Sequence, residues 1–216
     1  MPIWLSDTDR EALLAGSTTR RYPQGSFLFH EGDPPGWLAI IRSGHVKVTG
    51  ARSDGGESIL SILGPDELIG ELSALDGSPR IASVRALDDV EAALVTPGAF
   101  EDFLTRHPGA TLALLRMLAS RMRASDRLQI EFGSTDTLGR LSRRLVELAD
   151  GHGVTEPDGV RIELPIRQED LAAWIGASRE SVAKALRALR ERGTVTTARK
   201  RIVVRDLDAL RARAAR

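Results

Sequence analysis

The chain contains no cysteine, and this absence excludes disulfide bonds, thiolate metal sites and cysteine-ligated iron–sulfur clusters. It also has no apolar run that approaches the roughly 20 residues needed to cross a bilayer. At the start of the sequence no basic segment precedes an apolar stretch, so no secretory signal is visible. We therefore expect a cytoplasmic protein that has no membrane partner.

The motifs of common enzymes are missing as well. The sequence has no Walker phosphate loop, no GxSxG nucleophile elbow and no GxGxxG dinucleotide loop. Its four histidines are scattered, and none has metal-ligand spacing: His30, His45, His107 and His152. Glu71 lacks the partner acid or nucleophile that a general base would need. We therefore predict no enzymatic activity, no catalytic residue, no metal and no bound cofactor.

The formal net charge is zero, but the charges are unevenly distributed. Residues 1–136 contain 13 Lys and Arg against 19 Asp and Glu, a net charge of −6. Residues 137–216 contain 17 against 11, a net charge of +6. A basic segment of this kind is the electrostatic pattern expected of a nucleic-acid-binding domain. We therefore expect the second part of the chain, and not the first, to contact DNA.

Residues 164–191 carry the pattern of a helix-turn-helix. Apolar residues within 168–175 recur with the spacing of one buried helical face. Gly176 follows, and glycine tolerates the positive φ that a tight turn between two helices requires. Ser178 is then placed to cap a second helix with its hydroxyl. The pattern predicts two helices joined by a short turn.

The second of these helices would expose Arg179, Glu180 and Lys184 in its first turns. Arg or Lys can pair with guanine, and a carboxylate can accept from the amino group of cytosine, so these side chains suit the major groove. The alternative is an ordinary helical hairpin with a solvated, charged face.

The segment after Gly193 favours DNA binding over that alternative. It alternates into two short strands about a turn at 198–201, and two such strands form a wing beside the second helix. The turn contains Arg199 and Lys200, which are well placed for phosphates.

Short alternating runs, broken by turn residues, fill positions 21–94. Many short strands at this spacing predict a β-sandwich or jelly roll. Four apolar residues are expected to face its interior: Leu38, Ile40, Val46 and Val48. A short helix is predicted before the strands, over 6–15.

Helical spacing returns after Pro97, and Pro108 suits the first turn of a long helix. Residues at every third or fourth position form one stripe, as a two-stranded helical seam requires: Leu115, Leu118, Met122, Ser125, Gln129 and Phe132. Gly133 interrupts this helix, and Asp136 is placed to cap another over 137–150. We interpret 133–136 as an interdomain hinge.

Ser125, Asp126 and Gln129 are polar residues midway along this otherwise apolar helix. They have two interpretations. One is that they fix the register of a homodimer at some cost in stability. The other is that they face a ligand.

Residues 68–87 combine the features of an anion site. Gly70 allows the backbone to approach an anion, and the amides of Glu71 and Leu72 can begin a short helix whose N-terminus favours negative charge. Arg80 can form a charge-assisted pair with a phosphate. Glu71 can accept a hydrogen bond from a ribose 2′-hydroxyl.

Three segments in this order resemble the cyclic-AMP receptor protein/Fnr family of bacterial transcription regulators: FLFHEGD followed by IIRSGHVKV, LIGELSALDGSPRIASVRAL, and RQEDLAAWIGASRESVAKALRAL. The resemblance covers essentially the whole chain. It implies an α+β protein with an N-terminal β-roll, a jelly roll of the cyclic-nucleotide-binding type, over 1–107. A long dimerisation helix and hinge would follow over 108–135, and a winged helix-turn-helix over 136–216.

The resemblance implies that 68–87 is a phosphate-binding cassette. Cyclic AMP, or cyclic GMP as the second choice, would be an allosteric effector held between the β-roll and the dimerisation helix. The family commonly has Ser or Thr after the cassette Arg, where this chain has Ile81. The Thr-Ser pair that reads adenine in the cyclic-AMP receptor protein is replaced by Ser125 and Asp126. A different effector and ligand-independent DNA binding therefore stay open.

On the DNA side, the resemblance places Arg179, Glu180 and Lys184 at base-reading positions, although the family usually has Arg where Lys184 stands. Three further residues would contact the DNA backbone: Ser178, Arg199 and Lys200. A homodimer would hold its two recognition helices about 34–36 Å apart, which predicts double-stranded DNA with a nearly palindromic operator. RNA polymerase is a further expected partner.

The mechanism that follows is a two-state coupling, in which a ligand near Ser125 and Asp126 biases the hinge at 133–136. Gly133 and Ser134 are poor helix interiors, so extending the helix through them is unfavourable without such help. Two other readings remain. A haem sensor is one, since some relatives bind haem, but no histidine is singled out as its ligand. A cyclic-nucleotide module acting on a protein partner is the other, and the complete winged helix-turn-helix disfavours it.

Overall fold

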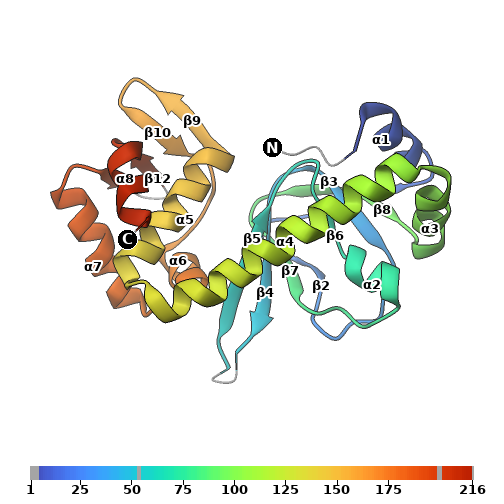
Figure 1. Cartoon of the computed structure of the whole chain (residues 1–216), viewed down its shortest axis with the longest axis horizontal. Coiled ribbons are helices and arrows are strands. Elements are labelled where there is room, and N and C mark those ends of the chain that lie inside the picture. The colour runs from blue at the N-terminus through green and yellow to red at the C-terminus, as the bar shows by residue number, and fades with distance from the viewer. Residues whose placement is uncertain (1–4, 53–54, 199–200, 216) are drawn as a thin grey trace. The chain divides into compact units, whose positions relative to one another are not determined.

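The computed structural model describes residues 5–52, 55–198 and 201–215, with the backbone alone for 129–134. The chain divides into two compact units, residues 1–126 and 127–216. Figure 1 follows the elements of each unit along the chain.

The first unit is built on two four-stranded antiparallel sheets. Their strand orders are β1-β8-β3-β6 and β2-β7-β4-β5, so most neighbouring strands are distant in sequence. The strands are β1 (Thr18–Tyr22), β2 (Phe27–Phe29), β3 (Leu38–Ser43), β4 (Val46–Ala51), β5 (Glu57–Leu63), β6 (Leu68–Ile69), β7 (Ser83–Ala86) and β8 (Val90–Val95). This arrangement confirms the predicted β-roll.

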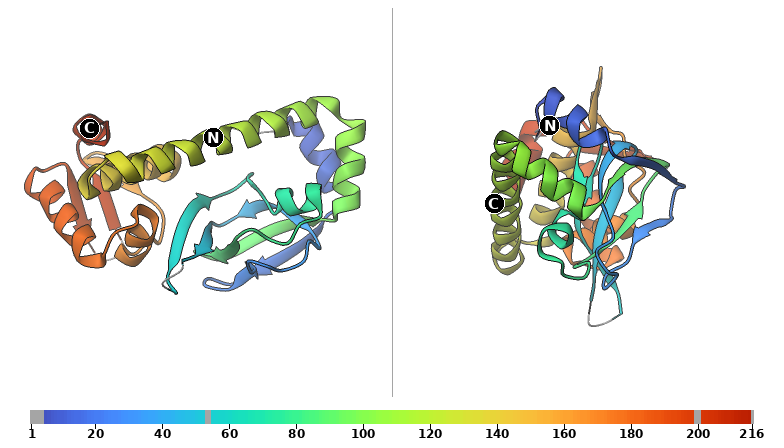
Figure 2. Two further views of the ribbon diagram at one scale, coloured as in Figure 1. Left: turned by 60° about the horizontal axis from the view of Figure 1, so that its bottom comes forward. Right: turned by 90° about the vertical axis from the view of Figure 1, so that its right-hand side faces the viewer.

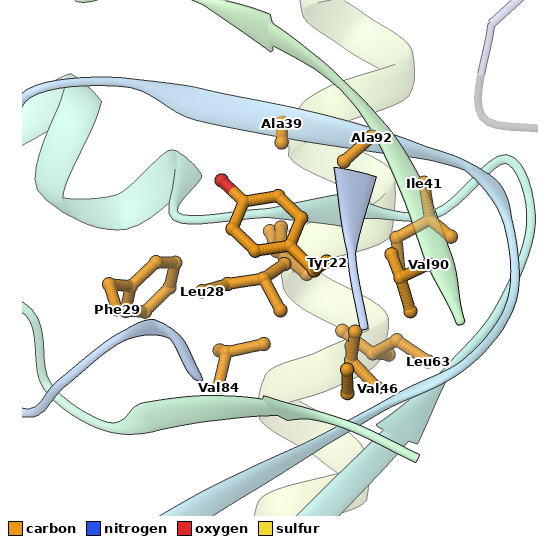
Figure 3. Close-up of a cluster of buried hydrophobic side chains, with 12 residues drawn as sticks. Tyr22, Leu28, Phe29, Ala39, Ile41, Val46, Leu63, Val84, Val90 and Ala92 are labelled. Atoms are coloured by element: carbon orange, nitrogen blue, oxygen red, sulfur yellow. The ribbon is translucent and has the colours of Figure 1, made fainter. Parts of the chain in front are cut away.

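Apolar side chains from both sheets meet inside the roll, as Figure 3 shows. Strand β3 is buried on both faces, because Ala39 and Ile41 join this interior cluster while Leu38 and Ile40 belong to a second cluster with helical residues. The prediction that Leu38 and Ile40 face the interior with Val46 was therefore wrong. A strand covered on both sides has two apolar faces, and alternation does not tell which of them is the roll interior.

Three helices supply the second cluster. Helix α1 (Asp7–Leu14) is capped by Ser6, and α3 (Pro97–Arg106) precedes α4 (Pro108–Ser134). Leu13, Phe100 and Leu114 bring the three helices into the cluster that covers the outer face of β3. Figure 2 shows α1 and α3 beside the first turns of α4.

Helix α4 begins at the predicted Pro108 but runs through Gly133 to Ser134, so the predicted interruption at Gly133 was wrong. One glycine costs a helix only about 1 kcal/mol, which is insufficient to end it. The break falls at Thr135 and Asp136, where the Asp136 carboxylate accepts the Gly139 N–H at 2.7 Å and caps α5. No described helix, the 27-residue α4 included, is both long and apolar enough to cross a membrane.

The second unit places helices around a four-stranded antiparallel sheet of order β11-β12-β10-β9. Its elements are α5 (Thr137–His152), β9 (Gly153–Glu156), β10 (Gly159–Ile162), α6 (Gln168–Ile175), α7 (Arg179–Glu191), β11 (Val195–Ala198), β12 (Arg201–Val204) and α8 (Leu207–Ala214). Helix α8, which the sequence analysis did not predict, packs along α5 and buries Leu210 completely.

Candidate effector and DNA-binding sites

The predicted cassette begins at a backbone turn that only glycine suits. Gly70 lies between β6 and α2 (Glu71–Asp76) with a φ of +77°, in the left-handed region. A Cβ added to Gly70 would stand 2.5 Å from the nearest guanidinium nitrogen of Arg80. Glycine is therefore required at position 70 for two reasons: its φ is positive, and Arg80 leaves no space for a Cβ.

Arg80 is almost completely buried, with 3% of its surface exposed. Its guanidinium donates to the carbonyl oxygens of Gly70, at 2.9 Å, and of Trp37. Its charge lies 4.2 Å from the centre of the Phe29 ring and 5.2 Å from that of Trp37. Burial lowers the pKa of Arg80, while Asp33 and Glu71 oppose that shift. The residues around Arg80 therefore hold a cation in a largely desolvated place.

One donor of this guanidinium is left over. Within the part of the chain that the structure describes, the buried Nε of Arg80 has no hydrogen-bond partner. A buried N–H without an acceptor is costly, and on a cation the missing acceptor is best supplied by an anion. The phosphate that the sequence analysis expected at Arg80 stays a prediction.

Glu71 is also buried, with 3% of its surface exposed, but it already has a partner. Its Oε1 accepts from Arg121 of α4 at 2.7 Å, and Arg121 donates a second hydrogen bond to the Leu68 carbonyl at 2.9 Å. A ribose hydroxyl at Glu71 would therefore share the carboxylate with Arg121. The sequence analysis missed Arg121, although it stands one helical turn before Ser125 and so on the same side of the helix.

The other predicted effector residues are exposed. Leu72 is 40% and Ile81 is 66% exposed, and Ile81 offers no hydroxyl beside Arg80. Ser125 and Asp126 are exposed residues of α4, four and five positions beyond Arg121. The structure thus brings Gly70, Glu71 and Arg80 together, and the roles of the four exposed residues stay predictions.

The predicted helix-turn-helix is formed by α6 and α7. Gly176 has a φ of +60° and ends α6, as the turn requires. Ser178 caps α7 by accepting the Ser181 N–H at 3.1 Å. Apolar residues of α7 are buried against the rest of the unit: Val182, Ala185, Leu186 and Leu189. Both helices and their turn are therefore confirmed.

The three predicted base-reading side chains are all exposed on α7. Arg179 is not isolated there, because its NH1 lies 3.2 Å from Oε1 of Glu169 in α6. Glu180 and Lys184 complete the outward face of the first turns of α7. The surface offers donors and an acceptor together, as reading of base edges requires.

The predicted wing is the antiparallel pair β11 and β12, in which Ala198 faces Arg201. Arg199 and Lys200 lie outside the described residues. Arg201 donates to Glu156 at 2.6 Å, and Arg161 reaches the same carboxylate at 2.6 Å. These two arginines lower the pKa of Glu156. Arg201 is therefore tied to the hairpin β9–β10.

The hairpin β9–β10 was not predicted. Its signal is present, however, since the apolar Val154, Val160 and Ile162 stand around the turn-forming Pro157-Asp158-Gly159. Among the described residues, no three His, Asp or Glu side chains gather in a way that would hold a metal ion.

Two family models match the chain. A model of the cyclic nucleotide-binding domain matches residues 19–107, and a model of the Crp-like helix-turn-helix domain matches residues 139–213. The first match includes the whole cassette, and the second includes α6, α7 and the wing.

Curated and solved proteins are similar over most of the chain. The CRP-like cAMP-activated global transcriptional regulator of Mycobacterium tuberculosis is 35% identical over 193 residues, which cover 89% of this chain and 86% of that protein. The cyclic AMP receptor protein of Thermus thermophilus is 34% identical, with 87% and 83% covered. The solved c-di-GMP responsive regulator CLP of Xanthomonas campestris is 26% identical, with a TM-score of 0.80 and 92% and 99% covered. The proteins from M. tuberculosis and X. campestris are both named as global regulators.

Proposed function

This chain belongs to the cyclic-AMP receptor protein/Fnr family of DNA-binding transcription regulators, and we propose that it acts as a homodimer whose DNA binding is controlled by a cyclic nucleotide. Cyclic AMP is the favoured effector, because the relatives from M. tuberculosis and T. thermophilus carry it in their names. Cyclic GMP is the second choice.

One observation carries the proposal: the buried Arg80 guanidinium, stacked on Phe29 and facing Gly70, retains an Nε donor without an acceptor. A cyclic phosphate is a singly charged anion that would accept from this donor and neutralise the buried cation. Glu71, held by Arg121, would then accept from the ribose 2′-hydroxyl. Leu72, Ile81, Ser125 and Asp126 would line the rest of the ligand.

The homodimer would form along α4, because that helix exposes large apolar side chains. Leu112, Leu115 and Met122 are 48%, 57% and 66% exposed. Leu115 follows Leu112 by three residues, and Met122 follows Leu115 by seven, as in the heptad repeat of a two-stranded seam. Asp126, four residues after Met122, occupies the next position of this repeat. Leu118 packs against the core of its own unit, so it leaves the predicted stripe. Gln129 and Phe132 have side chains outside the described residues.

Each protomer of this dimer would place α7 in a major groove. Arg179, Glu180 and Lys184 would read bases, and Ser178, with Arg199 and Lys200 of the wing, would contact the DNA backbone. Two-fold symmetry of the dimer then requires a nearly palindromic operator in double-stranded DNA. Contact with RNA polymerase would convert DNA binding into regulation of transcription.

The coupling between ligand and DNA would pass along α4. Arg121 joins α4 directly to the cassette through Glu71 and the Leu68 carbonyl. A ligand that competes for Glu71 would weaken the contact between Glu71 and Arg121, and so the attachment of this part of α4 to the cassette. The same helix ends at the break before Asp136, the residue that caps α5. A ligand thereby biases two states of one continuous element.

A regulator that answers to another effector, or to none, is the second candidate. Ile81 favours it, because this exposed apolar residue stands where the family commonly has a hydroxyl. Asp126 adds a negative charge near the expected purine position. The CLP relative is described as responsive to c-di-GMP, so members of this fold answer to more than one nucleotide.

Calorimetric titration of the full-length protein with cyclic AMP and cyclic GMP tests the proposal. Arg80→Ala is the matched variant, and Arg80→Lys, which keeps the charge but has fewer donors, guards against a folding defect. Micromolar binding that both variants abolish, with circular dichroism unchanged for at least one of them, supports gating by a cyclic nucleotide. No heat with either nucleotide means that gating by these ligands is wrong and favours the second candidate.

A further inference from the structure

Helix α8 reaches the break between α4 and α5 through one arginine. The NH2 group of Arg213 lies 2.6 Å and 2.5 Å from the two carboxylate oxygens of Asp136. The Arg213 side chain is 18% exposed and that of Asp136 is 62% exposed, so the arginine is largely covered while the carboxylate faces water. The same carboxylate caps α5 by accepting the Gly139 N–H at 2.7 Å. Arg213 therefore holds the group that begins α5.

The rest of α8 is fastened along α5. Arg143 of α5 donates to the Ala214 carbonyl at 2.7 Å, and Leu210 is completely buried. Space at the break is tight as well, because a Cβ on Gly139 would stand 2.6 Å from Cγ2 of Thr135 and 3.4 Å from NH1 of Arg213. The break is thus held by α8 and cannot move without disturbing this packing.

Arg140 joins the same break to the helix-turn-helix. Its NH1 donates to the Thr135 carbonyl at 2.6 Å, and its Nε donates to the Ile175 carbonyl at 2.9 Å. Ile175 is the last residue of α6, directly before the Gly176 turn that leads into the recognition helix. One short chain of contacts therefore runs from α8 through the break to α6.

We propose that Arg213 is a positioning residue for DNA binding, which acts through Asp136 to fix the break between α4 and α5 and thereby the placement of α6 and α7. The inference rests on the DNA-binding function and not on the identity of the effector. Arg213 lies in α8, which follows the wing in the sequence, so the sequence pattern of the helix-turn-helix does not reveal its role.

A double-mutant cycle on DNA affinity tests the assignment. Arg213→Gln, Asp136→Asn and the double variant of the full-length protein are titrated against a palindromic DNA fragment selected with the wild type. Fluorescence anisotropy gives each Kd without nucleotide and with cyclic AMP. Arg211→Gln is the matched control, because Arg211 lies on the same helix and pairs with Asp150 at 2.8 Å, away from the break. Thermal unfolding of every variant records the purely structural effect.

We expect Arg213→Gln and Asp136→Asn each to raise the Kd for DNA by at least about fivefold, and the double variant to be no worse than either. Arg211→Gln stays within about twofold of wild type, although its unfolding midpoint falls comparably. Arg213→Lys, which keeps the charge, recovers part of the affinity. Equal Kd values for the Arg213 and Arg211 variants overturn the proposal, and so do additive effects in the cycle. The proposed effector is tested separately, by comparing the wild-type Kd for DNA with and without cyclic AMP.

Discussion

Arg121 of the long helix α4 and Glu71 of the cassette form an ion pair of 2.7 Å, in which the carboxylate side chain is only 4% exposed. Buried carboxylates are tolerated when they are paired, and they become costly when the partner is removed. The Leu68 carbonyl accepts from the same guanidinium, so Arg121 fastens α4 to both ends of the β6–α2 turn. This pair links the proposed ligand site to the helix that leads to the second unit.

Arg121→Gln is expected to destabilise the first unit by about 1–3 kcal/mol, because it leaves the Glu71 carboxylate without its charged partner. Denaturant unfolding, followed by circular dichroism, measures the loss. Arg123→Gln is the control, since Arg123 is an exposed arginine of the same helix two residues away. Equal losses for the two variants would show that the buried pair contributes nothing.

Gly70→Ala is expected to destabilise the protein more than Gly77→Ala does. Both glycines flank α2 in the left-handed region, at φ values of +77° and +73°. Alanine in this region costs roughly 1–2 kcal/mol at either position. Only at Gly70 does the added Cβ also meet Arg80, at 2.5 Å, whereas Gly77 has nothing within 4 Å.

The difference between these two alanine variants isolates the Arg80 contact, because the backbone term is shared. Unfolding in denaturant gives the two free energies, and titration with cyclic AMP gives the effect on ligand binding. Gly70→Ala should weaken binding, while Gly77→Ala should leave it near the wild-type value. Identical behaviour of the two would mean that Arg80 moves aside without consequence.

Periodicity predicted much of this molecule. The 3.6-residue repeat and the Gly176 turn identified the helix-turn-helix, and alternation identified the β-roll and the wing. The sequence analysis failed where two local interpretations were possible, or where the contacting residues are far apart in the sequence. β3 is apolar on both faces, so Leu38 was assigned to the wrong side. Gly133 is a weak helix residue that a long helix nevertheless accommodates.

Contacts between distant segments were the part of the site that sequence did not reveal. Gly70 and Arg80 are ten residues apart and belong to one recognisable segment. Arg121 lies 50 residues beyond Glu71, and nothing in its own neighbourhood marks it as the partner of a buried carboxylate. Arg213 reaches Asp136 across 77 residues, at the end of a helix that has no motif. Such pairs depend on the fold, which local spacing does not encode.

Ile81→Ser is expected to strengthen cyclic AMP binding by about tenfold, since a hydroxyl beside Arg80 can donate to the phosphate. Stability should change little, because Ile81 is 66% exposed. Leu75→Ser is the control, as Leu75 is a 46% exposed residue of α2 that is not expected to reach the phosphate. Calorimetry measures both affinities. If serine at position 81 leaves binding unchanged, the phosphate does not lie beside this residue.

Glu169→Gln is expected to tighten binding to DNA of any sequence while reducing the preference for the operator. The carboxylate lies 3.2 Å from Arg179 in the free protein, so it both orients this side chain and repels phosphates. The change in each Kd should reach up to about fivefold, as for an exposed ion pair. Glu191→Gln is the control, because Glu191 pairs with Arg187 at the other end of α7.

Anisotropy titrations of these two glutamate variants against operator and scrambled DNA, at two salt concentrations, give the discrimination directly. An operator preference that Glu169→Gln leaves intact would mean that Arg179 finds its position without Glu169.

The stability that Asp136 contributes is expected to depend on pH in the acidic range. Hydrogen bonding from the Gly139 amide, and then the charge of Arg213, hold the pKa of Asp136 below its ordinary value of 3.8. A carboxyl group with a lowered pKa stabilises the folded state above its ordinary pKa, and this contribution disappears as the pH falls through the lowered value.

The wild type should therefore have a higher unfolding midpoint than Asp136→Asn at neutral pH, and the difference between the two midpoints should disappear in acid. Thermal unfolding of both proteins from about pH 7 downward measures it, with Asp150→Asn as the control for an exposed carboxylate of the same helix. A gap that stays constant with pH would show that the charge on Asp136 does not matter and that only its capping geometry does.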